Sequence, residues 1–141
     1  MSAKELRFYS RLQIAAHTLK KRSDRQLLDV AGVTTAQISA LAIVASETAA
    51  TQSMLANQLG LNGSAVTPMV RRLIDMDMLR RGRDESDGRA WLLELTPAGR
   101  ETLDKAALIT DQTSDAVDRL LGKKTIATVV AAMELIINDL D

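Results

Sequence analysis

An abrupt change of apolar period near residue 90 constrains the fold more than any other feature. Residues 89–96, RAWLLELT, place alternate apolar side chains on one face, as a half-buried strand requires, whereas apolar residues elsewhere recur at helical spacing. The DESDG before it is typical of a turn, so residues 79–83 and 89–95 are predicted to form a hairpin. We expect Trp91, Leu93 and Leu95 on its inward face, with Trp91 packed at the base of the hairpin.

The rest of the chain is predicted to be helical. Apolar spacing indicates helices over about 5–29, 34–47, 51–60, 63–78, 97–121 and 123–140. Capping patterns support several of these boundaries: Thr34 with Gln37 fits a capping box, Thr51 can cap the short third helix, and Gly60 can end it. The sequence Thr96-Pro97 is a strong helix start. The predicted fold is mainly α with a small β-hairpin, and its 141 residues suffice for one domain.

Residues 51–73, TQSMLANQLGLNGSAVTPMVRRL, fit a helix-turn-helix. Ala56 is small where the two helices would cross, and Gly60 suits the turn between them. The side chains expected to form a buried wedge between the helices are Leu55, Leu59, Leu61, Val66 and Val70. With these buried, the second helix turns its hydroxyl-bearing N-terminal end and its arginines outward.

The outward residues suit double-stranded DNA. Small side chains near the start of the second helix can reach base edges, and arginines further along can reach phosphates. An arginine-bearing hairpin directly after a helix-turn-helix predicts a winged helix, whose hairpin can enter the adjacent minor groove. Arg89 is the first candidate for that insertion and Arg83 the second. The predicted DNA-binding residues are Thr51, Gln52, Ser53, Asn62, Ser64, Ala65, Thr67, Pro68, Arg71, Arg72, Arg83 and Arg89. The alternative is an ordinary helical hairpin with a solvated arginine face.

Composition and charge argue against several other classes of protein, such as enzymes, metalloproteins and membrane proteins. The sequence has no cysteine, which rules out disulfides and thiolate metal sites, and its formal net charge is zero. His17 has no clustered partner, and no pattern indicates a nucleophile, a phosphate loop or a metal site, so neither an enzyme nor a cofactor is expected. No apolar run approaches the roughly 18 residues of a membrane helix, and the N-terminus lacks a signal-peptide core. A cytoplasmic protein is therefore expected.

Three stretches together resemble the MarR (multiple antibiotic resistance regulator) family of winged-helix transcription factors: GVTTAQISAL, LANQLGLNGSAVTPMVRRL and, most specifically, DESDGRAWLLELTPAG. The resemblance implies one MarR-like domain over 1–141, with a winged helix-turn-helix at about 34–96 and dimerisation helices at about 5–29 and 97–140. It implies a homodimer that binds palindromic operator DNA and represses its target genes. It also implies a small aromatic or phenolic effector that binds between the dimerisation and DNA-binding parts and releases the DNA.

The expected dimer interface uses the first and last helices. A wide apolar stripe on the last helix agrees with this independently, because a monomer would expose part of it. The predicted dimerisation residues are Leu6, Tyr9, Leu12, Ile126, Val129, Val130, Met133, Ile136, Ile137 and Leu140.

Two positions depart from the family's pattern. The family often has arginine or lysine near Gly63 and Pro68, which are uncharged here. Together with the neutral net charge, this keeps open a winged-helix protein–protein interaction module without DNA binding. Pro68 also disfavours a helix, by roughly 3 kcal/mol in a helix interior. The spacing from Gly60 to Val66 nevertheless predicts that the helix begins near Gly63.

Overall fold

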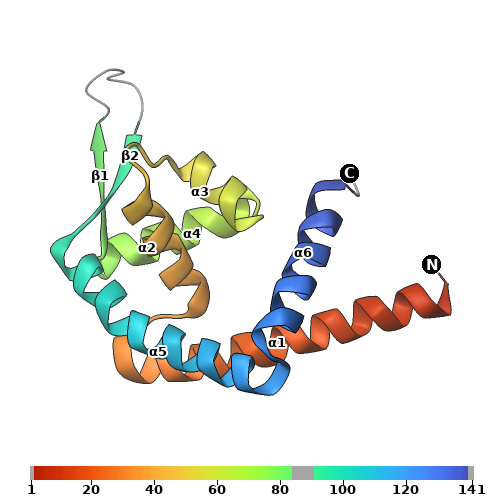
Figure 1. Cartoon of the computed structure of the whole chain (residues 1–141). Helices are drawn as coiled ribbons and strands as arrows, with labels where there is room; N and C mark the ends of the chain where they lie inside the picture. Colours follow the sequence, from red (N-terminus) through yellow and green to blue (C-terminus); the bar gives the residue numbers. More distant parts are fainter. Residues whose placement is uncertain (1, 84–90, 140–141) are drawn as a thin grey trace. The chain divides into compact units, whose positions relative to one another are not determined.

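Helices dominate the computed structural model, which describes residues 2–83 and 91–139 (Figure 1). Two predicted site residues, Arg89 and Leu140, lie outside the described residues. The described elements follow the chain as α1 (Ala3–Ala31), α2 (Thr35–Ser46), α3 (Gln52–Leu59), α4 (Gly63–Asp75), β1 (Leu79–Arg83), β2 (Trp91–Leu95), α5 (Pro97–Leu121) and α6 (Lys123–Asp139). The predicted fold class, mainly α with a small two-stranded sheet, is confirmed.

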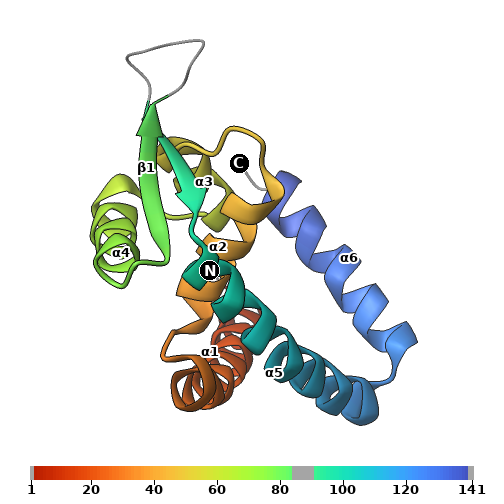
Figure 2. The ribbon, with the colours of Figure 1, turned by 90° about the vertical axis from the view of Figure 1, so that its left-hand side faces the viewer.

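The chain forms two compact units, Met1–Ala107 and Leu108–Asp141, with the boundary inside α5. The first unit contains the helix-turn-helix and the hairpin, hereafter the ribbon. Within it, α2 contacts α1, α3 and β2, while α4 contacts α3 and β1. Figures 1 and 2 show the ribbon beside α3 and α4 in both views.

Local capping sets the helix starts. The Thr34 hydroxyl accepts a hydrogen bond from the Gln37 backbone N–H, and the Gln37 side chain accepts one from the Thr34 N–H at 2.9 Å. This is the predicted capping box of α2. Thr51 caps α3 by accepting from the Met54 N–H at 3.1 Å. The observed caps confirm these two predicted helix starts. Both were predictable because each cap joins residues only three apart in the sequence.

The end of α4 departs slightly from the prediction. The helix stops at Asp75, three residues before the expected end at 78. Asp77 adopts a left-handed conformation with φ 58°, and the Met78 N–H donates to the Leu73 carbonyl while the Asp77 N–H donates to Ile74. This is a Schellman ending, in which an aspartate takes the place that glycine usually holds.

The core lies where α2, α3, α4 and the ribbon meet. Its buried members are Ala40, Leu41, Val44, Ala50, Leu55, Val66, Val70, Leu73, Leu79 and Leu93. Two predicted members are wrong: Leu61 is 38% exposed and Trp91 is 56% exposed. Leu61 follows the turn at Gly60, beyond the helix crossing that buries the rest of the wedge. Trp91 begins β2 at the end of the ribbon far from α5, where no helix covers it.

The ribbon is tied to the core at its base. The Leu93 N–H donates to the Ala50 carbonyl at 2.8 Å, which joins β2 to the segment between α2 and α3. Thr96 caps α5, as predicted, by accepting from the Gly99 N–H at 3.0 Å. At Gly99, a β-carbon would lie 2.2 Å from the Met78 carbonyl oxygen, so only glycine allows α5 to approach the start of β1 this closely. These contacts set where the ribbon leaves the core.

The second unit consists of the end of α5 and all of α6, joined at Gly122, whose φ is 79°. No described residue of α6 is buried. The apolar side chains that it exposes include Val129, Val130, Leu135 and Ile137. Of the apolar stripe predicted for the last helix, Val129, Val130 and Ile137 are therefore exposed in a single chain, whereas Ile126, Met133 and Ile136 are half-buried.

Candidate nucleic-acid interface

The turn between α3 and α4 holds the two helices of the candidate DNA-binding site. Gly60 adopts the left-handed conformation with φ 63°, and the Leu61 N–H donates to the Ala56 carbonyl at 2.9 Å. Asn62 then caps α4, because its side-chain oxygen accepts from the Ala65 N–H at 3.0 Å and from the Ser64 hydroxyl at 2.6 Å. One predicted base-contacting side chain, Asn62, thus already uses its oxygen to start the helix.

The two faces of α4 differ sharply. Val66, Val70 and Leu73 are fully buried, at 0% exposure. The predicted DNA-contacting side chains Ser64, Ala65, Pro68, Arg71 and Arg72 are all exposed. Ser64, Pro68 and Arg72 are four residues apart, which places them in one row on a helix. The structure thus assembles a solvent-facing surface with small side chains at its N-terminal end and guanidinium groups further along.

Pro68 lies inside α4 without ending it. A proline lacks the N–H that would bond to the carbonyl four residues earlier, here that of Ser64. Ser64 is exposed, so water can satisfy that carbonyl. The predicted helix start near Gly63 is confirmed, and the local helix-start pattern at Thr67-Pro68 does not prevail, because Asn62 provides the cap and Val66 is buried.

Three predicted contact residues lie at the start of α3. Thr51 is half-buried, and its hydroxyl caps the helix, whereas Ser53 is exposed. The Gln52 side-chain N–H donates to the Thr67 hydroxyl at 2.7 Å, so the first turn of α3 is bonded to the outer side of α4. A hydroxyl that accepts one hydrogen bond can still donate one. The contact therefore orients Thr67 and leaves it a donor.

The ribbon carries three described arginines, all exposed: Arg80, Arg81 and Arg83. Arg80 pairs with Glu94 directly across the strands, with 2.7 Å between its Nε and the carboxylate. The Arg83 guanidinium lies over the Trp91 ring, 5.2 Å from its centroid. Arg89, the first candidate for groove insertion, lies outside the described residues together with the acidic tip at 84–87.

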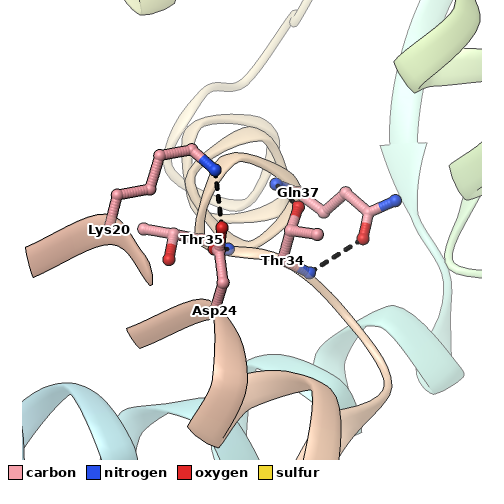
Figure 3. Close-up of polar contacts among 5 residues, drawn as sticks. All are labelled: Lys20, Asp24, Thr34, Thr35 and Gln37. Atoms are coloured by element: carbon pink, nitrogen blue, oxygen red, sulfur yellow. Dashed lines mark hydrogen bonds and ion pairs between the residues drawn. The ribbon is translucent and has the colours of Figure 1, made fainter. Parts of the chain in front are cut away.

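Asp24 joins α1 to the start of α2 (Figure 3). One of its carboxylate oxygens accepts from the Thr35 backbone N–H at 2.7 Å, and the other pairs with the Lys20 ammonium at 2.5 Å. Burial by itself raises the pKa of Asp24, but the hydrogen bonds from Lys20 and Thr35 and the Lys20 charge outweigh it, so the pKa lies below its ordinary value. Because Thr35 is the first residue of α2, the carboxylate also faces the positive end of that helix.

Basic side chains gather on one face of α1. A hollow of about 690 Å³ is lined by His17, Thr18, Lys21, Arg22, Arg25 and Gln26. An adjoining hollow of about 490 Å³ adds Lys20, Asp24 and Leu28. Apart from Asp24, which is paired with Lys20, these lining residues contain no acid, so the surface favours an anion.

Other kinds of site find little support within residues 2–83 and 91–139. No group of three or more His, Cys, Asp and Glu side chains could hold a metal ion there. No single helix in this part of the chain is long and apolar enough to cross a membrane; α1 and α2 meet the length and composition criteria only as a pair bent by 71°.

Sequence reasoning missed the contacts that join separate elements. The Arg83–Trp91 pair follows from the hairpin register, in which these residues lie opposite one another. A predicted register could therefore have indicated it. The bonds from Gln52 to Thr67 and from Thr35 to Asp24 span 15 and 11 residues between helices. No local pattern signals these two.

Comparison with known proteins connects this chain to transcriptional regulators of the MarR family. A model of the MarR family matches residues 33–91. The organic hydroperoxide resistance transcriptional regulator of Bacillus subtilis (strain 168) is 30% identical over 98 residues, which span 70% of this chain and 62% of that protein's length.

Solved structures share the fold. Sco3205, a MarR family transcriptional regulator from Streptomyces coelicolor solved in complex with DNA, has a TM-score of 0.87 at 24% identity, covering 100% of this chain and 94% of that one. The PcaV transcriptional regulator from the same organism, solved with its natural ligand, has a TM-score of 0.77 at 22% identity, covering 95% and 92%. The family match over residues 33–91, which contain the capped helix-turn-helix described above, identifies the winged-helix part of the chain as a MarR family domain.

Proposed function

We propose that this protein is a transcriptional regulator that binds palindromic double-stranded DNA as a homodimer and represses the genes it controls. The observation that carries the proposal is the two-faced α4. Its apolar face is fully buried, and its outer face presents small polar groups followed by exposed arginines. A ribbon with three further arginines follows directly.

The residues divide into base-reading and phosphate-binding roles. Ser64 and Thr67 offer hydroxyl groups near the start of α4, where a recognition helix contacts base edges. Arg71 and Arg72 lie further along and suit phosphates. Arg83 would extend the contact to the neighbouring groove. Gln52 has a positioning role in this scheme, because it holds the Thr67 hydroxyl.

Uncovered apolar surface supports the homodimer. In the first unit, α1 exposes Leu6 at 52% and Tyr9 at 49%. In the second unit, α6 exposes Val130 at 51% and Ile137 at 64%. Exposed apolar stripes on helices mark sites of association. A second copy of the chain, presenting the same helices, is the partner that the family predicts.

The basic surface of α1 supports an anionic effector, and the family resemblance adds that the effector is aromatic. The hollows along α1 are lined by Lys21, Arg22 and Arg25, which suit a carboxylate. PcaV was solved with a natural ligand, so a protein of this fold can hold a small molecule. We propose that an aromatic acid binds along α1 and lowers the affinity of this protein for DNA.

Binding to a duplex from the region upstream of its own coding sequence, measured across salt concentrations, tests DNA recognition. Each lost phosphate contact should reduce the slope of log affinity against log salt by about 0.9. Arg71→Ala and Arg72→Ala should each weaken binding and lower the slope. Arg100→Ala is the matched control, because Arg100 is an exposed arginine on α5 outside this surface.

The competing function is a protein–protein interaction module. It is favoured by the stretch from Asn62 to Pro68, which contains no charged side chain. If the wild-type protein binds no duplex even at low salt, DNA recognition fails and this alternative gains support. Equal affinity of wild type and both α4 variants would refute the phosphate-binding roles alone.

A further inference from the structure

Asp24 lines a hollow on α1 and also joins α1 to α2. Its side chain borders the smaller hollow, together with Lys20, Lys21 and Arg25. The same carboxylate accepts a hydrogen bond from the Thr35 N–H at the start of α2 (Figure 3). A charge that enters the hollow therefore acts on the group that links the two helices.

The Thr35 N–H depends on an acceptor from outside its own helix. Thr35 is the first residue of α2, and the N–H groups of a first helical turn have no acceptor within the helix. Asp24 supplies the acceptor at 2.7 Å, from a side chain that is only 18% exposed. Because its pKa is lowered, the carboxylate is charged at neutral pH, which strengthens the bond. A change at Asp24 therefore loosens or tightens the first turn of α2.

The hollow offers an anion the same cation that Asp24 uses. Lys20 pairs with the second carboxylate oxygen of Asp24, and Lys20 also lines the hollow. Lys21, Arg22 and Arg25 supply further positive charge. Asp24 is the one acid among the described residues that line the two hollows. An anion held by these cations lies near the Asp24 carboxylate, and neighbouring like charges disfavour each other.

The start of α2 is connected to the DNA-binding elements. Besides α1, α2 contacts α3 and β2. The first of these is the first helix of the helix-turn-helix, and the second is a strand of the ribbon. A looser junction between α1 and α2 therefore changes how firmly the DNA-binding elements are held against α1.

We propose that Asp24 couples an anion bound in the α1 hollow to the DNA-binding part of the chain. The anion draws on Lys20 and opposes the negative charge of Asp24, and it thereby weakens the hydrogen bond from Thr35. The inference rests on the proposed function, to which it adds the residue and the contact through which the effector acts. Coupling of this kind is reciprocal, so the Asp24 charge also weakens binding of the anion.

Titration of the full-length, nitrogen-15-labelled protein with benzoate tests the coupling, and benzamide serves as the uncharged control. In the wild type, benzoate should shift the amide signals of residues 17–28 and speed hydrogen exchange of the Thr35 N–H, whereas benzamide should do neither. Benzoate should also lower the affinity of the wild type for a duplex from its own upstream region.

Three variants identify the groups involved. Asp24→Asn keeps an acceptor oxygen and removes the charge, so it should bind benzoate about 5-fold more tightly, a small coupling because solvent and salt screen a partly exposed site. In this variant benzoate should no longer change exchange at Thr35 or the affinity for DNA. Lys20→Gln should bind benzoate more weakly than the wild type. Asp29→Asn is the matched control, because Asp29 is exposed on α1 and lines neither hollow.

The outcomes separate the inference from the proposed function. Equal benzoate affinity of wild type and Asp24→Asn, or unchanged exchange at Thr35 in the benzoate-saturated wild type, would overturn the coupling and leave the effector site standing. A wild type that binds no benzoate would refute the effector site and the inference together. A wild type that binds no duplex would refute DNA recognition alone, because the benzoate and exchange measurements use no DNA. Urea unfolding checks that each variant is folded under the conditions of the titration.

Discussion

The bond between Asp24 and Thr35 predicts a loss of stability that depends on pH. This bond joins α1 to the start of α2, so it holds the long first helix against α2. The variants that test it are Asp24→Ala, which removes the acceptor, and Asp24→Asn, which keeps an acceptor oxygen but loses the charge. Lys20→Gln is the matched control, because it removes only the outer partner.

The magnitude follows from the contacts. The Asp24 side chain is 18% exposed, and it accepts from a backbone N–H at a helix start. A hydrogen bond to a charged group contributes about 1.5–3 kcal/mol, so Asp24→Ala should lower the free energy of unfolding by about 2 kcal/mol. Asp24→Asn should lose about 1 kcal/mol, the part due to charge at the helix terminus. The Lys20 side chain is 56% exposed, so Lys20→Gln should change stability by less than about 0.5 kcal/mol.

The sign of the pH dependence follows from the lowered pKa of Asp24. A carboxyl group with a folded pKa below its unfolded value stabilises the fold above the unfolded pKa of about 3.9. That contribution is lost as pH falls through the folded pKa. The gap between wild type and Asp24→Asn should therefore be full at neutral pH and shrink below about pH 4.

Urea unfolding followed by far-ultraviolet circular dichroism, at neutral pH and near pH 3, measures these differences. Wild-type stability in Asp24→Ala would refute the role of the carboxylate as the bond between α1 and α2. A gap between wild type and Asp24→Asn that persists unchanged at low pH would refute the charge-based part of the reasoning. An effect of Lys20→Gln as large as that of Asp24→Ala would show that the Lys20–Asp24 ion pair, and not the bond to Thr35, provides the stabilisation.

Two further predictions concern packing and assembly. Gly99→Ala places a β-carbon 2.2 Å from the Met78 carbonyl oxygen, so it should lower the free energy of unfolding by about 2–3 kcal/mol in urea. Gly63→Ala meets no atom within 4 Å and should stabilise by up to about 1 kcal/mol; two equal effects would contradict the close approach seen at Gly99. Val129→Glu on the exposed stripe of α6 should convert the dimer to a monomer or unfold it, as measured by light scattering after size exclusion, whereas Lys124→Glu should not. A Val129→Glu dimer of unchanged stability would refute the assignment of α6 to the interface.

Features controlled by near neighbours were predictable from the sequence. The capping box at Thr34, the cap at Thr51 and the left-handed turn at Gly60 each depend on groups a few residues apart. The start of α4 near Gly63 also follows from local spacing, and the cap at Asn62 stabilises it despite Pro68. The set of outward residues on α4 followed from the same helical period, since burying one face of a helix exposes the other.

Tertiary structure decided which side chains the core reaches and which elements touch. Alternation along β2 places Trp91 and Leu93 on one face, but only Leu93 lies where the segment before α3 covers the strand. Leu61 was expected in the wedge and is 38% exposed, because the crossing of α3 and α4 buries only the side chains between the two helices. The bonds of Asp24 to Thr35 and of Gln52 to Thr67 join residues on different helices, so they exist only once those helices pack together. The sequence by itself determined the helices, the strands and the side chains that face outward. Packing between these elements decided which side chains are buried and which hydrogen bonds join one helix to another.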